Sequence, residues 1–132
     1  MIIADGTVFA GVLDGRGELT ALVSDLWKRR QVGAPPAVFA ELLAHETSAR
    51  RAAQLRTWAV EAPKLAQGPL AWVAAGDLVA HLAAHGVRLT LVEGLVLATC
   101  VREAGRLWSL NPAFRAARKV VPFDTYTPGG IE

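Results

Sequence analysis

The sequence predicts an α/β domain in which helices cover both faces of a mostly parallel sheet. The chain opens on a short apolar run, Met1–Ala4, and such runs are typical of strands buried on both faces. Further short apolar runs then alternate with longer helical patterns, as they do in parallel sheets. With 132 residues, 52% of them hydrophobic, the chain is long enough for one core, so we expect a single domain over residues 1–132.

In the first half of the chain, turn and capping residues place the elements. Residues 5–7 end the first strand, and the turn sequence 14–17 separates the first two helices. Pro35 and Pro36 open the third helix, since proline is tolerated in a first turn, and Ser48 caps the fourth. The expected elements are helices over residues 8–13, 18–30, 35–45 and 48–60, and a short strand over 31–34.

The second half of the chain continues the alternation. Pro69 opens a long alanine-rich helix, which Gly86 stops. Thr90 and Glu93 have the spacing of a capping box, and Asn111 before a proline is typical of a helix start. The expected elements are helices over residues 69–84, 90–103 and 111–117, strands over 87–89, 106–110 and 120–121, and a loose tail over 126–132.

Composition and charge exclude several classes of protein. A formal net charge of +2, with 20% charged residues, excludes a highly charged disordered chain. The single cysteine, Cys100, cannot form an internal disulfide and lies in an apolar stretch, so we expect a buried thiol and a reducing cytoplasm. The sequence shows neither a basic leader nor an apolar run of ~18 residues, so we expect a soluble cytoplasmic protein without a membrane span.

Four polar residues come soon after expected strands: Asp5, Glu41, Glu93 and Asn111. Each has an ordinary structural explanation. Asp5 and Asn111 would cap the helices that follow them, and Glu93 would complete its capping box. Glu41 would pair with His45 one helical turn later. For any one of these residues alone, the structural explanation is the more frequent one.

Taken together, the four residues predict a metal site. The residues that follow parallel strands gather at one edge of the sheet, where ligands of such folds bind. Three carboxylates gathered there repel one another unless a cation lies among them. Oxygen ligands select hard cations such as Mg²⁺ or Mn²⁺, and such a cation in an open cleft suits phosphoryl chemistry.

Two other catalytic patterns fail on the sequence. Asp5 after a buried strand is similar to the first motif of the haloacid-dehalogenase-type phosphatases, but Ile3 stands where that motif has its nucleophilic aspartate. His81 and His85 are four residues apart and could bind a metal on one helix face. Neither a cysteine nor a neighbouring glutamate of the HExxH type supports them, so a solvated helix face explains the pair better.

Four segments carry these residues in a fixed order: Met1–Ala10 with the first acid, Val38–Leu43, Gly86–Ala98 and Arg106–Phe114. In order, spacing and total length they resemble the PIN-domain ribonucleases, in particular the VapC-type toxins of toxin–antitoxin pairs. The resemblance implies a three-layer sandwich around a mostly parallel sheet. It also implies an Mg²⁺- or Mn²⁺-dependent endoribonuclease that hydrolyses RNA phosphodiesters.

The resemblance gives each site residue an expected role. Asp5, Glu41 and Glu93 would hold the metal, directly or through water. Asn111 would orient a water or weakly ligate a second ion, and Thr7 would support the first acid by a hydrogen bond. Three arginines near the last motif are candidate contacts to RNA phosphates, although solvated helix ends explain them equally well: Arg106, Arg115 and Arg118.

The sequence departs from the family pattern at four positions. Glu93 stands where an aspartate is usual, Asn111 stands where an aspartate is more frequent, Ala113 replaces a further acid, and Gly6 replaces a residue that is more often hydroxylic. The alternative is therefore a weakened or inactive PIN-fold protein that binds RNA or a protein partner through the same cleft. The family also implies a homodimer and a cognate antitoxin whose C-terminal segment fills the cleft.

Overall fold

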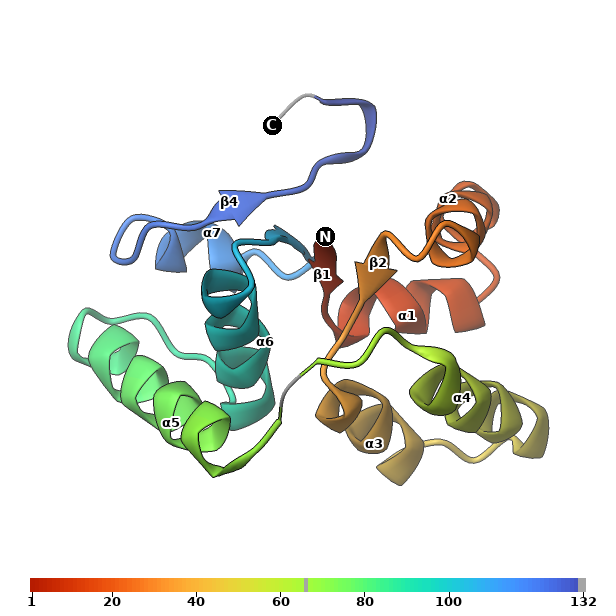
Figure 1. The fold of residues 1–132 in the computed structure, drawn as a ribbon, viewed down its shortest axis with the longest axis horizontal. Coiled ribbons are helices and arrows are strands. Elements are labelled where there is room, and N and C mark those ends of the chain that lie inside the picture. The colour runs from red at the N-terminus through yellow and green to blue at the C-terminus, as the bar shows by residue number, and fades with distance from the viewer. Residues whose placement is uncertain (66, 131–132) are drawn as a thin grey trace.

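The computed structural model describes residues 1–65 and 67–130 of the chain (Figure 1). Its strands form one sheet in the order β2-β1-β3-β4, and every strand pair is parallel. The strands are β1 (Ile2–Ala4), β2 (Val32–Gly33), β3 (Arg106–Trp108) and β4 (Asp124–Thr125). Helices flank this central sheet on either side, so the predicted α/β class and parallel sheet are confirmed.

The predicted helices all form, with ends displaced by at most two residues. Except for α2, which follows Arg16, they begin where the sequence has capping residues or prolines, because these satisfy or remove the unpaired N–H groups of a first turn. The helices are α1 (Gly6–Leu13), α2 (Gly17–Lys28), α3 (Pro36–Ala44), α4 (Ala49–Glu61), α5 (Pro69–Ala84), α6 (Leu91–Arg102), α7 (Ala113–Ala117) and the 3₁₀ helix η1 (Pro128–Gly130).

The first strand is the centre of the fold. Ile2, Ile3 and Ala4 are all buried, and β1 pairs with β2 on one side and with β3 on the other. Ala4 lies opposite Trp108 in this pairing. Because the strands are parallel, the residues that follow these two leave the sheet at the same edge.

The predicted strand over residues 87–89 is wrong. Val87 and Leu89 are buried and Arg88 is exposed, so the segment has a strand-like alternation, but it is irregular. The two central strands, β1 and β3, are already paired on both edges and have no free edge to offer. The alternation therefore reflects burial of Val87 and Leu89 in the hydrophobic core rather than strand pairing.

The last strand begins four residues later than predicted, at Asp124 rather than Val120. The N–H groups of Val120 and Val121 both donate to the carbonyl of Ala117, at 3.0 Å each. These bonds continue the turn after α7, so the two valines are unavailable for a sheet ladder.

The predicted loose tail begins at a residue that is anchored. The N–H of Tyr126 donates to the carbonyl of Leu107 at 2.7 Å, and the Tyr126 ring lies 4.9 Å from that of Trp108. Residues 131 and 132 of the predicted tail lie outside the described residues.

An aromatic cluster fixes the helices of the first half around α1. The ring of Phe9 lies 4.9 Å from Phe39, 5.3 Å from Trp58 and 6.0 Å from Trp27, measured between centroids. Edge and tilted ring contacts at such distances add to the burial of apolar area. The cluster thereby holds α1, which Asp5 caps, against α3, which carries Glu41.

The helix pair α5 and α6 packs closely through Gly94. A Cβ at this position would lie 2.4 Å from Val79 Cγ2 and 3.0 Å from the carbonyl oxygen of Ala75. The absence of a side chain at Gly94 therefore allows α6 to pack close to α5. This packing also determines the position of Glu93, the residue before it. No helix in the described part of the chain is long and apolar enough to cross a membrane.

Candidate functional site

Asp5 lies at the end of β1 and is buried, with 3% of its surface exposed. It caps α1: its Oδ1 accepts hydrogen bonds from the Thr7 N–H at 3.0 Å and from the Thr7 hydroxyl at 2.5 Å. The structural explanation of this residue is thus correct, as is the expected support from Thr7. Neither excludes a functional role, because the second carboxylate oxygen faces a different partner.

That partner is Ser109, which follows β3 and which sequence reasoning missed. Its hydroxyl donates to Asp5 Oδ2, and the Asp5 N–H donates to the Trp108 carbonyl at 3.1 Å. The signal was available in the sequence, since a polar residue directly after the adjacent parallel strand occupies the same edge of the sheet. The strand was expected to run to residue 110 but ends at Trp108, so Ser109 fell inside the expected strand rather than after it.

Asn111 extends the connection to α6. Its backbone N–H donates to Ser109 Oγ at 2.9 Å, and its side-chain Nδ2 donates to Glu93 Oε2 at 2.5 Å. The other Glu93 oxygen accepts from the Thr90 N–H at 2.8 Å and completes the capping box. A continuous hydrogen-bonded chain, which we call the polar chain, therefore runs Asp5–Ser109–Asn111–Glu93.

The electrostatics of Asp5 favour a cation. Burial raises the pKa of its carboxyl, and the hydrogen bonds from Ser109 and Thr7 offset only part of that effect. Its partners are hydroxyl and amide groups, and none of the ion pairs seen in residues 1–65 and 67–130 involves it. A buried carboxylate without a cation is costly, so a divalent ion fits the chemistry of this position.

Glu41 is not drawn into the polar chain. It is exposed on α3, and the hydrogen bonds and ion pairs of the described residues do not include it, with His45 or otherwise. Its helix nevertheless passes beside the site, because a Cβ at Gly6 would lie 3.6 Å from Leu42 Cδ2. Among the residues that the structure describes, no three His, Cys, Asp or Glu side chains are grouped so as to hold a metal ion.

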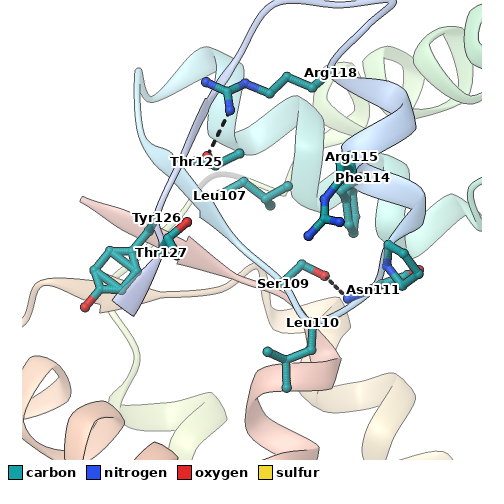
Figure 2. A pocket seen from close by; sticks show the side chains of 11 residues that line it. Leu107, Ser109, Leu110, Asn111, Phe114, Arg115, Arg118, Thr125, Tyr126 and Thr127 are labelled. Carbon is teal, nitrogen blue, oxygen red and sulfur yellow. Dashed lines mark hydrogen bonds between the residues drawn. The ribbon is translucent and has the colours of Figure 1, made fainter. Parts of the chain in front are cut away.

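A pocket of about 560 Å³ opens beside the polar chain, between α7 and the end of β4 (Figure 2). Ser109 and Asn111 form one end of it with Arg115 beside Asn111, and Arg118 lies at the other end next to Thr125. Arg118 donates to the Thr125 hydroxyl at 3.2 Å and so links α7 to β4. Two of the three candidate arginines, Arg115 and Arg118, therefore line the same pocket.

Arg106 lies elsewhere. Its guanidinium is 5.2 Å from the centre of the Tyr126 ring, a cation–π contact, and this ring packs on Trp108. Because side chains alternate along a strand, Arg106 and Trp108 point to the face of β3 opposite Leu107 and Ser109. This arginine is not grouped with the other two.

Comparison with known proteins bears on the fold. Neither a protein-family model nor a curated protein matches the sequence. Among solved structures, the crystal structure of FitAcB from Neisseria gonorrhoeae is similar to 99% of this chain and 100% of the matched chain, with a TM-score of 0.66 and 16% sequence identity. The fold is PIN-like. At this identity the similarity concerns the path of the backbone, and the chemistry depends on the residues described above.

Proposed function

We propose that the protein is an Mg²⁺- or Mn²⁺-dependent endoribonuclease and the toxin of a type II toxin–antitoxin pair. The observation that carries the proposal is the polar chain, which joins a buried carboxylate at the end of β1 to a carboxylate of α6 through residues that follow β3. In a PIN-like fold this edge of the sheet is where ligands bind. The motif resemblance to VapC-type toxins supplies the reaction class.

The residues would divide the work as follows. Asp5 and Glu93 would hold the metal, with Glu41 contributing from α3, and the bound ion would make water nucleophilic near neutral pH. Thr7 and Ser109 fix the Asp5 carboxylate from both sides. Arg115 and Arg118 would bind the RNA backbone, because guanidinium groups match phosphate geometry.

Cleavage of a single-stranded RNA in Mg²⁺, stopped by EDTA, tests the proposal. Asp5→Asn should abolish cleavage and leave the fold intact, because asparagine keeps the shape of the cap and loses the charge. Asp25→Asn is the matched control, since Asp25 is exposed on α2 and pairs with Arg29 one turn away. An Asp5→Asn protein that cleaves as fast as the wild type would overturn the assignment.

The toxin part of the proposal concerns partners. Its supports are the PIN-like fold and the VapC-like motifs, and it includes self-association as a homodimer and a small antitoxin that fills the cleft. A short upstream reading frame for a DNA-binding protein, copurifying with this chain when both are expressed, would support it. Growth arrest on expression of the chain alone, relieved by that protein, is the second expected result.

A second candidate function is a PIN-fold protein that binds RNA or a protein partner without cleaving. Two observations favour it: the described residues lack a group of three metal-ligating acids, and Asn111 occupies one oxygen of Glu93 at 2.5 Å. Binding of RNA that is insensitive to EDTA, with no cleavage in Mn²⁺ over hours, would decide for this function.

A further inference from the structure

We infer that the pocket between α7 and β4 receives one nucleobase of the RNA strand that lies along the polar chain. This inference rests on the proposed function and adds recognition of a base to it. The pocket volume of about 560 Å³ is within the ~300–1,000 Å³ typical of small-molecule sites. The pocket shares Ser109 and Asn111 with the polar chain, so its occupant lies directly beside the acids (Figure 2).

The walls of the pocket have the character that a base requires. Leu107 and Phe114, both buried, provide apolar surface, and Thr125 and Thr127 provide hydroxyl groups from alternate positions at the end of β4. Flat bases are held in proteins between apolar or aromatic side chains, with polar groups at their edges.

The charge around the pocket favours a phosphate-bearing occupant. Residues 109–123 contain three cations and no acid, and no acid is among the described residues that line the pocket. The Arg115 guanidinium points into the pocket, toward Leu107 and Asn111, and the described residues offer it no ion pair (Figure 2). A pocket wall without acids, next to the acidic polar chain, suits an RNA strand in which one phosphate contacts Arg115 and a neighbouring phosphate lies at the metal.

Binding of short RNAs without metal tests this inference independently of cleavage. The probe is a fluorescently labelled six-nucleotide single-stranded RNA in EDTA, compared with RNAs of the same length and charge that carry one abasic ribose at each position in turn. Stacking and burial of one base are worth on the order of a tenfold change in affinity. We expect one abasic position to weaken binding about tenfold and the others to change it little.

Two variants assign the effect to this pocket. Thr127→Leu adds bulk to the wall, so it should weaken the intact RNA about tenfold and abolish the further loss caused by the abasic position. Arg115→Gln should weaken every RNA and lower the slope of log affinity against log salt by about 0.7, the value for one phosphate on a single strand. Arg56→Gln, at an exposed position of α4, is the matched control and should change neither quantity.

Each outcome bears on the inference. Equal affinities for the intact and all the abasic RNAs would overturn it, because only the backbone would then be recognised. An abasic effect that persists unchanged in Thr127→Leu would place the base elsewhere and would also overturn it. Preference for a glutamate-rich hexapeptide over the RNA would assign the pocket to a protein partner instead. Failure to cleave, with these binding results intact, would overturn the ribonuclease proposal alone.

Discussion

The side-chain amide of Asn111 donates to Glu93 Oε2 at 2.5 Å, and its carbonyl oxygen accepts from the Ala113 N–H at 3.0 Å. The residue thus caps α7 with one end and orients a carboxylate of α6 with the other. One side chain therefore both caps a helix and holds the Glu93 carboxylate. The same holds for Glu93, whose second oxygen closes a capping box.

Replacement of Asn111 by aspartate should therefore trade stability for metal affinity. Aspartate caps a helix as well as asparagine does, but here it would place a second carboxylate against Glu93. Without metal, we expect the free energy of unfolding to fall by about 1 kcal/mol or more from like-charge contact. With Mn²⁺, the added charge should tighten binding by about tenfold, or 1–2 kcal/mol, after part of the attraction is offset by desolvation.

Calorimetric titration with Mn²⁺ and denaturant unfolding in EDTA measure the two effects. Asn111→Ser is the matched control, because serine also caps helices but carries no charge and is too short to reach Glu93 in the same way. Equal Mn²⁺ affinities of the wild type and Asn111→Asp would show that the Asn111–Glu93 pair does not face a metal.

The raised pKa of Asp5 gives a pH dependence with a definite sign. Burial makes ionisation of this carboxyl harder in the folded than in the unfolded chain, so its contribution to stability decreases as pH rises from the unfolded pKa through the folded one. The asparagine of the Asp5→Asn variant does not ionise, so the stability of this variant lacks that decrease with pH. The difference in Tm, variant minus wild type, should therefore increase between pH 3.5 and 7 in EDTA.

Added Mg²⁺ should reverse that difference at pH 7. A ligand that binds only the folded state stabilises it by mass action. The wild type, with an ionised Asp5, would bind Mg²⁺ and be stabilised, whereas the Asp5→Asn protein would not. A Tm difference that is flat with pH, or an equal rise of both proteins in Mg²⁺, would contradict the electrostatic account of this residue.

The helices and the central sheet could be predicted from the sequence because their signals are local. Prolines 36 and 69, Ser48 and the Thr90–Glu93 box mark helix starts that the structure keeps. The strand at 87–89 was mispredicted because alternation reports burial, whereas pairing depends on which strand edges are free. The strand at 120–121 was mispredicted because the turn after α7 consumes both N–H groups.

The candidate site was predictable in part. Asp5, Glu93 and Asn111 lie in one hydrogen-bonded chain, and Thr7 supports the first of them. Ser109 was missed because the strand was expected to run to residue 110 and so to include it, whereas β3 ends at Trp108. Arg115 and Arg118 line one pocket, whereas Arg106 lies on the other face of β3. This separation could not be predicted, because β3 is only three residues long and its alternation of faces is too short to recognise in the sequence.

Cys100 should be inert to alkylation in the folded protein. Its thiol is fully buried and donates to the Gly105 carbonyl at 3.1 Å, and burial, with a smaller contribution from Asp124, raises its pKa to about 11. At pH 8 only about one thiol in a thousand is then ionised, and thiolate is the reactive form. Iodoacetamide at pH 8 should label the chain in denaturant at least a hundredfold faster than without it. Comparable rates in the two conditions would contradict the burial of this thiol.

A glycine pair tests the packing of α5 on α6. Gly94→Ala places a methyl group 2.4 Å from Val79 Cγ2 and 3.0 Å from the Ala75 carbonyl oxygen, and a backbone atom cannot yield as a flexible side chain can. We expect the free energy of unfolding to fall by about 1–2 kcal/mol, because overpacking outweighs the helix propensity of alanine.

Gly76→Ala, in the interior of α5, is the matched control. A Cβ at this position meets nothing within 4 Å, so the same exchange should stabilise the protein by about 0.5–1 kcal/mol. Urea unfolding of both variants measures the two signs, and a Gly94→Ala protein stabilised as much as Gly76→Ala would show that α6 does not pack on α5 through this residue.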